Sequence, residues 1–135
     1  MTIKNLNRFI NTRQDIAGGT AFTTINNCSI KVIVPTDANL TRLLLNFIGW
    51  GDVTVNNAAT GSFRFQLVQT GQSNTTYSSI MMSSWATTHN AASAGVRFTF
   101  PIAYASEDLA PGTYTFTLQV RREGEMGAAP SRVSV

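Results

Sequence analysis

The sequence contains few of the residue types that build disulfides, metal centres and catalytic sites. It has one cysteine, Cys28, one histidine, His89, and seven acidic residues among 135 positions. A single cysteine cannot form a disulfide within the chain, and zinc and calcium sites need several His, Cys or carboxylate ligands brought together. Nucleophilic catalysis needs a nucleophile activated by an oriented base, and His89 lies in a polar stretch typical of a loop. We therefore expect no catalytic residue, no metal site and no cofactor.

Two further catalytic arrangements are also missing from the sequence. The phosphate-binding strings G-x-G-x-x-G and G-x-x-x-x-G-K-S/T do not occur. Glycoside hydrolysis would need two carboxylates facing each other across a groove. The acidic residues Glu107, Asp108, Glu123 and Glu125 all fall in predicted turns instead. The chain is therefore not predicted to be an enzyme.

Charge and long apolar runs are scarce as well. Charged residues make up 13% of the chain, and ten basic against seven acidic residues give a net charge of +3. This mild excess forms no long basic run, so we expect no nucleic-acid partner. No segment approaches the roughly 18 to 20 apolar residues of a membrane span, and the N-terminus lacks the apolar stretch of a signal peptide. We therefore expect no membrane partner.

What the chain does have is the apolar alternation of β-strands. In residues 113–120, which read TYTFTLQV after the Pro111-Gly112 turn, the apolar residues lie on one face. Glycine and asparagine residues separate the strands, as is typical of turns. The pattern predicts an all-β protein, a single antiparallel β-sandwich of jelly-roll type that occupies residues 20–135. About eight strands are expected, at residues 20–26, 28–34, 40–50, 62–68, 76–82, 95–104, 113–120 and 131–135.

The first nineteen residues differ from the rest and are predicted to form an N-terminal arm. Basic and apolar residues alternate there with one acid, Asp15, and the segment ends at Gly18-Gly19. Such a segment is either a loosely held terminus or a docking segment that becomes ordered against a partner. The candidate docking residues are Lys4, Leu6, Arg8, Phe9 and Arg13.

The predicted strand at 40–50 is apolar on both faces. A sandwich strand normally buries one face, here Leu43, Leu45 and Phe47, so the opposite face needs an additional cover. The arm or a second copy of the chain could supply it, because exposed apolar patches of this kind mark interfaces. Among symmetric homo-oligomers we favour a homotrimer. The candidate interface residues are Leu44, Ile48 and Trp50.

Two other groups of residues suggest ligand binding. Four aromatic residues could form a platform on which a sugar stacks, although aromatic residues of a small β domain more often fill the core. Three arginines are expected on outward strand faces and would form a stripe if their strands were neighbours, although solvated strand surface is favoured. The aromatic set is Trp50, Tyr77, Trp85 and Tyr104, and the arginine set is Arg64, Arg97 and Arg121.

The order of these segments resembles the small jelly-roll domains of tailed-bacteriophage virion proteins, both head decoration (cement) proteins and tail-fibre tips. The segments are CSIKVIVPTDANLTRLLLNFIGWGDVT, GSFRFQLVQTGQ, GVRFTFPIAYASEDLAPGTYTFTLQVRREG and SRVSV, over residues 28–135. The most specific part is a strand that ends in an acidic helical turn, followed by a Pro-Gly turn and TYTFTLQVRR. The resemblance implies a non-enzymatic, trimeric protein that binds other virion proteins or host glycans.

The short arm after Met1 favours a free-standing decoration protein, because tail-fibre tips usually end much longer chains. We therefore expect a virion structural protein that stabilises the capsid by bridging capsid subunits. Its partners would be the major capsid protein and copies of itself, with a host glycan also possible. It would be assembled in the host cytoplasm and lie on the capsid surface. A receptor-binding tail-fibre tip and a carbohydrate-binding module are the alternatives.

Overall fold

The structure is a computed structural model that describes residues 13–16, 21–38, 41–55, 61–83, 94–124 and 131–135. The described residues form nine strands and no helix, and every strand pair is antiparallel. No helix long and apolar enough to cross a membrane was found in this part of the chain. The strands are β1 (Arg13–Ile16), β2 (Thr23–Val34), β3 (Leu44–Val55), β4 (Gly61–Gly71), β5 (Thr75–Thr76), β6 (Ile80–Ser83), β7 (Ala94–Ala105), β8 (Gly112–Gly124) and β9 (Ser131–Ser134).

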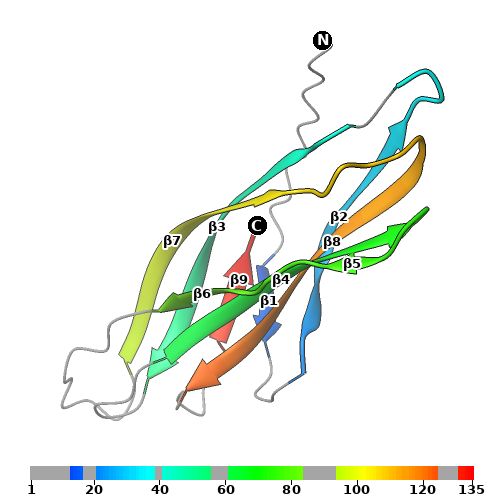
Figure 1. The fold of residues 1–135 in the computed structure, drawn as a ribbon. Helices are drawn as coiled ribbons and strands as arrows, with labels where there is room; N and C mark the ends of the chain where they lie inside the picture. Colours follow the sequence, from blue (N-terminus) through cyan, green and yellow to red (C-terminus); the bar gives the residue numbers. More distant parts are fainter. Residues whose placement is uncertain (1–12, 17–20, 39–40, 56–60, 84–93, 125–130) are drawn as a thin grey trace.

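The strands form two sheets that lie over one another as two layers (Figure 1). The four-stranded sheet has the order β1-β9-β3-β7. The five-stranded sheet has the order β2-β8-β4-β5, and β6 also pairs with β4. The all-β, antiparallel sandwich predicted from the sequence is confirmed at this level.

The core lies between the sheets and contains the residues that alternation placed inward. Phe63, Phe65 and Leu67 on β4 are fully buried, and so are the apolar residues of β8 from Tyr114 to Val120. The rings of Phe65 and Phe100, one from each sheet, have centroids 4.8 Å apart, so aromatic packing joins the layers. Burial of this apolar surface is the main force that holds the sheets together.

β2 contains an irregularity that explains why the sequence suggested two strands there. Its register with β8 shifts between Thr24 and Ser29, and Asn27 has a φ of 60°, which asparagine tolerates better than most residues. The side-chain amide of Gln14 on β1 bridges this region. Its Nε2 donates to the Thr24 carbonyl at 3.1 Å, and its Oε1 accepts from the Asn26 N–H at 2.6 Å. One side chain thereby joins the outer strands of the two sheets.

The structure differs from the sequence-based expectation at the end of the expected arm and at one turn. Residues 13–16, which the sequence pattern assigns to the arm, form β1, pair with β9 and bury Ile16 in the core. The sandwich therefore begins before residue 20. The acidic helical turn expected between the strand at 95–104 and the Pro111-Gly112 turn is not helical, and Leu109 instead forms a β-bridge with Thr41. Residues 1–12 lie outside the described residues.

Candidate functional site

The outer surface of β3 and β7 carries the strongest candidate for an interaction surface. Leu44 and Ile48 on β3 are 70% and 77% exposed, although both are large apolar residues. In the register of the sheet, Leu44 lies opposite Ala105 and Ile48 lies opposite Pro101. Between them Asn46 lies opposite Ala103. We call the surface formed by these three pairs the β3–β7 face.

Uncharged residues make up the whole β3–β7 face. Its members on β7, Pro101, Ala103 and Ala105, are exposed, because the residues between them, Ile102 and Tyr104, point into the core. Apolar side chains at directly opposite and diagonal positions of a sheet are close enough to act as one patch. The face therefore combines large and small apolar groups with one uncharged polar residue, Asn46, in a surface suited to packing against another protein.

Trp50, the third predicted interface residue, lies at the margin of this face. It is half-buried and pairs with Thr99 on β7 and with Ser134 on β9. Ser134 in turn pairs with Arg13 on β1, so Trp50 and the exposed Arg13 share one line across the sheet. Two strand spacings of about 4.8 Å separate them. The structure thus brings one predicted arm residue next to the predicted interface.

The three outward arginines do not form a single stripe. Arg64 on β4 and Arg121 on β8 lie directly opposite each other, whereas Arg97 belongs to β7 in the other sheet. The neighbouring Arg122 lies opposite the buried Phe63 and donates to the Ile16 carbonyl at 3.5 Å. Burial lowers the pKa of Arg122. Two of the three predicted arginines are therefore neighbours.

The described members of the aromatic set do not form a sugar-stacking platform. Tyr104 points inward, where its hydroxyl donates to the Phe65 carbonyl at 3.2 Å, and burial raises its pKa to about 12. Tyr77 packs against it, with ring centroids 6.2 Å apart. Trp50 lies on the outward side of β3, away from both. Trp85 lies outside the described residues.

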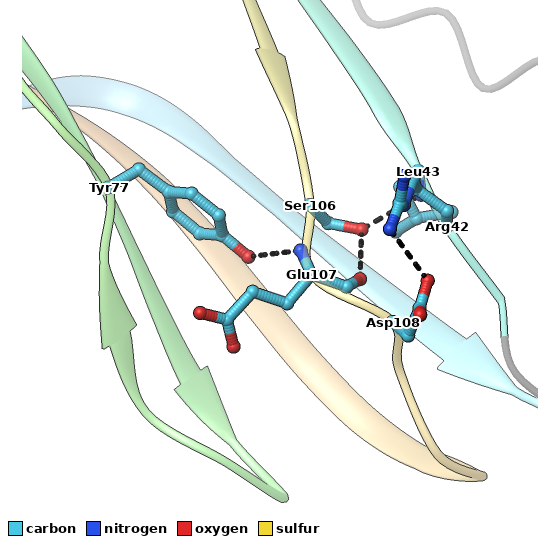
Figure 2. Close-up of polar contacts among 6 residues, drawn as sticks. All are labelled: Arg42, Leu43, Tyr77, Ser106, Glu107 and Asp108. Carbon is cyan, nitrogen blue, oxygen red and sulfur yellow. Dashed lines mark hydrogen bonds and ion pairs between the residues drawn. The ribbon is translucent and has the colours of Figure 1, made fainter.

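Glu107 and Asp108 belong to a network of hydrogen bonds and one ion pair that joins the loops at one end of the sandwich (Figure 2). The Glu107 N–H donates to the Tyr77 hydroxyl at 3.2 Å, and Asp108 forms an exposed ion pair with Arg42 at 3.1 Å. The Ser106 hydroxyl accepts a hydrogen bond from the Leu43 N–H at 2.8 Å. Figure 2 shows the two carboxylates on opposite sides of their segment, so they do not face each other.

The Tyr77 hydroxyl extends this network into the interior. It donates to Oε1 of Gln69 at 2.6 Å, and the Gln69 side-chain nitrogen donates to the Ser73 hydroxyl at 2.9 Å. Gln69 is only 1% exposed, and a buried amide needs such partners. We call Gln69, Ser73, Tyr77, Ser106 and Glu107 the Tyr77 network. The hydrogen bonds of this network join loops to one another and therefore have a structural role.

Several candidates fall outside the described residues. They include the arm residues Lys4, Leu6, Arg8 and Phe9, and also His89 and Glu125. Within the described ranges, no three His, Cys, Asp or Glu residues lie close enough together to hold a metal ion. Cys28 is buried.

Sequence reasoning found Leu44 and Ile48 but missed the β7 half of the face. Pro101, Ala103 and Ala105 are small or ring-shaped residues that give no strong hydrophobic signal alone. Their contribution depends on the register between β3 and β7, which the sequence does not reveal. Comparison with protein-family models, with curated proteins and with solved structures gives no match.

Proposed function

We propose that the sandwich is a jelly roll. β6 pairs with residues 62–65 of β4, and β5 pairs with residues 68–69 of the same strand. They therefore fill one strand position, interrupted between them. With that position counted once, the first strand pairs with the last, the second with the next-to-last, and so on inward. This order supports a jelly roll, because its two Greek keys arise when one long hairpin folds over itself.

The function that the site supports best is non-enzymatic assembly, in which copies of the chain associate through the β3–β7 face. The single observation behind this proposal is the exposure of Leu44 and Ile48 on an uncharged face. Fully burying one such side chain contributes about 1.5–3 kcal/mol. Two residues per copy, with their small β7 neighbours, would make a substantial contribution to an interface.

Within this class we propose a head decoration protein of a tailed phage, a trimer that bridges capsid subunits. The resemblance of residues 28–135 to phage jelly-roll domains supports this role, and so does the strand order. A decoration protein attaches to other virion proteins through non-covalent contacts and catalyses no reaction. A surface with few charges suits such a role. The predicted docking residues Lys4, Leu6, Arg8, Phe9 and Arg13 would contact the major capsid protein.

The first experiment measures the solution mass of the purified chain by light scattering after size exclusion. The wild type should give about three times the chain mass of 14.6 kDa. The double variant Leu44→Asp with Ile48→Asp should give a folded monomer, because exposed substitutions seldom change monomer stability by more than about 0.5 kcal/mol. Ile33→Asp is the matched control, since Ile33 is 69% exposed but lies on β2 of the other sheet.

The outcomes separate the roles. A monomeric wild type, or a double variant that remains trimeric, would contradict assembly through this face. A trimer that binds heads lacking decoration protein, and raises the temperature at which they rupture, supports the capsid role. Binding to tails instead of heads would favour the tail-fibre tip. A monomer that binds neutral sugars would favour a carbohydrate-binding module.

A further inference from the structure

The five-stranded sheet carries a second surface feature, the pair formed by Arg64 and Arg121. They lie directly opposite each other on β4 and β8. Both point away from the core, because their chain neighbours Phe63, Phe65 and Val120 are fully buried. Opposite residues on a sheet have Cβ atoms about 4.5–5.5 Å apart. The two arginine side chains therefore leave the sheet from adjacent positions, although like charges at opposite positions do not favour folding.

Contacts on either side define the positions of the two guanidinium groups. Cζ of Arg121 lies 4.7 Å from the centroid of the Phe22 ring, in a cation–π contact. Nη1 of Arg64 donates to the Ser79 hydroxyl at 3.0 Å. Long side chains that are already ordered lose less conformational freedom when they bind a ligand. These contacts thus order the two guanidinium groups at separate points of the face, Arg121 beside Phe22 next to β2 and Arg64 beside Ser79 next to β6.

Hydrogen-bonding groups continue along the same face from the arginine pair. Gln66 and Gln119 are the next outward pair, and their amides are joined by a hydrogen bond of 2.7 Å. Beyond them the hydroxyls of Ser29 and Thr117 lie 2.9 Å apart. Amides and hydroxyls both donate and accept. The face therefore carries two guanidinium groups and neutral polar groups beside them.

We propose that this face binds an acidic polysaccharide, with Arg64 and Arg121 each holding a carboxylate of the sugar chain. The planar fork of a guanidinium group fits the two oxygens of a carboxylate. The amides and hydroxyls next to the pair would bond to sugar hydroxyls, and the Phe22 ring would supply an apolar surface. The site does not depend on the assembly role, because it lies on the other sheet.

An acidic peptide is a poorer fit to this position. Extended peptides gain affinity by adding backbone hydrogen bonds at an open sheet edge. β8 lies between β2 and β4, and β4 lies between β8 and the strands β5 and β6. At Arg64, β4 is paired on both sides, with β6 and with β8, and the pairing of β8 with β2 reaches Val120, the residue before Arg121. A ligand over this face would therefore bind through side chains, as a polysaccharide does.

The test measures binding of polygalacturonate to the full chain by titration calorimetry at about 150 mM salt, where exposed charges further apart than about 8 Å are largely screened. Arg64→Gln and Arg121→Gln should each weaken binding at least tenfold, as expected when a charged hydrogen-bond donor is removed. Lys31→Gln is the matched control. Lys31 is exposed on the same sheet, where it pairs with Thr115, six residues along β8 from Arg121. The Lys31→Gln variant should bind polygalacturonate as tightly as the wild type does.

Further measurements test for misfolded variants and for general attraction of polyanions. Neutral dextran should not bind, and circular dichroism should show that each variant is folded. Arg64→Lys keeps the charge but loses the fork, so it should also bind more weakly, and it serves if the glutamine variants do not fold. The proposal is overturned if polygalacturonate does not bind or if Lys31→Gln weakens binding as much as the arginine variants do. Equal binding of dextran sulfate or single-stranded DNA would also overturn it, because it would show non-specific attraction of polyanions.

Discussion

Replacing Tyr77 by phenylalanine should destabilise the fold by about 2–3 kcal/mol. The change removes the hydroxyl that donates to Oε1 of Gln69 at 2.6 Å and accepts from the Glu107 N–H at 3.2 Å. An acceptor left buried without a partner costs about 1–3 kcal/mol, and an ordinary hydrogen bond contributes about 1 kcal/mol. Gln69 is buried while Glu107 is exposed, so the glutamine side of the loss dominates.

Urea unfolding followed by circular dichroism measures this loss as a lower midpoint with an unchanged slope. Tyr114→Phe is the control, because the Tyr114 hydroxyl donates only to the Ala110 carbonyl at 2.8 Å and should cost about 1 kcal/mol. In a Gln69→Met background the cost of Tyr77→Phe should fall by more than half, since the two residues are coupled. A cost no larger than that of Tyr114→Phe, or one undiminished in that background, would refute the reasoning.

Two further predictions concern a turn and alkaline pH. At Gly71, which has a φ of +121°, an added Cβ would lie 2.3 Å from the Thr113 carbonyl oxygen, so Gly71→Ala should destabilise by at least about 2 kcal/mol in the urea assay. Gly112 also has a positive φ, +152°, but there the nearest atom belongs to the flexible Gln72 side chain, at 2.9 Å. Gly112→Ala should therefore cost less than Gly71→Ala, and equal losses at the two glycines would contradict this expectation. Because burial raises the pKa of Tyr104 to about 12 from about 10 in the unfolded chain, its contribution is complete below pH 10 and declines as the pH rises toward 12. Tyr104→Phe should flatten that decline in pH-dependent unfolding, and an identical decline in the variant would count against it.

The sequence predicted the parts of the fold that depend on local alternation. Phe63 and Phe65 on β4 and Phe116 on β8 lie in the core because strict alternation over a whole strand leaves only one way to bury the apolar side. β1 was missed because its four residues, RQDI, contain a single apolar residue. The two strands expected at 20–26 and 28–34 are one, because the irregularity around Asn27 interrupts the alternation without ending the strand.

The candidate sites were predictable only as lists of side chains. Alternation predicted that Leu44 and Ile48 lie on the side of β3 opposite Leu45 and Phe47. Both side chains are exposed, as this prediction requires. Which arginines are neighbours depends on the register of β4 with β8, a contact between segments far apart in the chain. The bond from Tyr77 to Gln69 likewise depends on the path of a loop. No periodicity in the sequence carries that information.

The outermost strands of the sandwich limit the way in which copies can associate. Open edges invite strands of other molecules and lead to fibres. Here β1 has only four residues, and β7 contains Pro101, which has no N–H to donate. The Gln14 amide already occupies backbone groups of β2, and β5 and β6 interrupt the fourth edge. Growth of a continuous sheet from molecule to molecule is therefore discouraged at the edges that the described strands form. In the proposed assembly, contact between copies would instead use the broad faces, where it can end in a closed particle of fixed size.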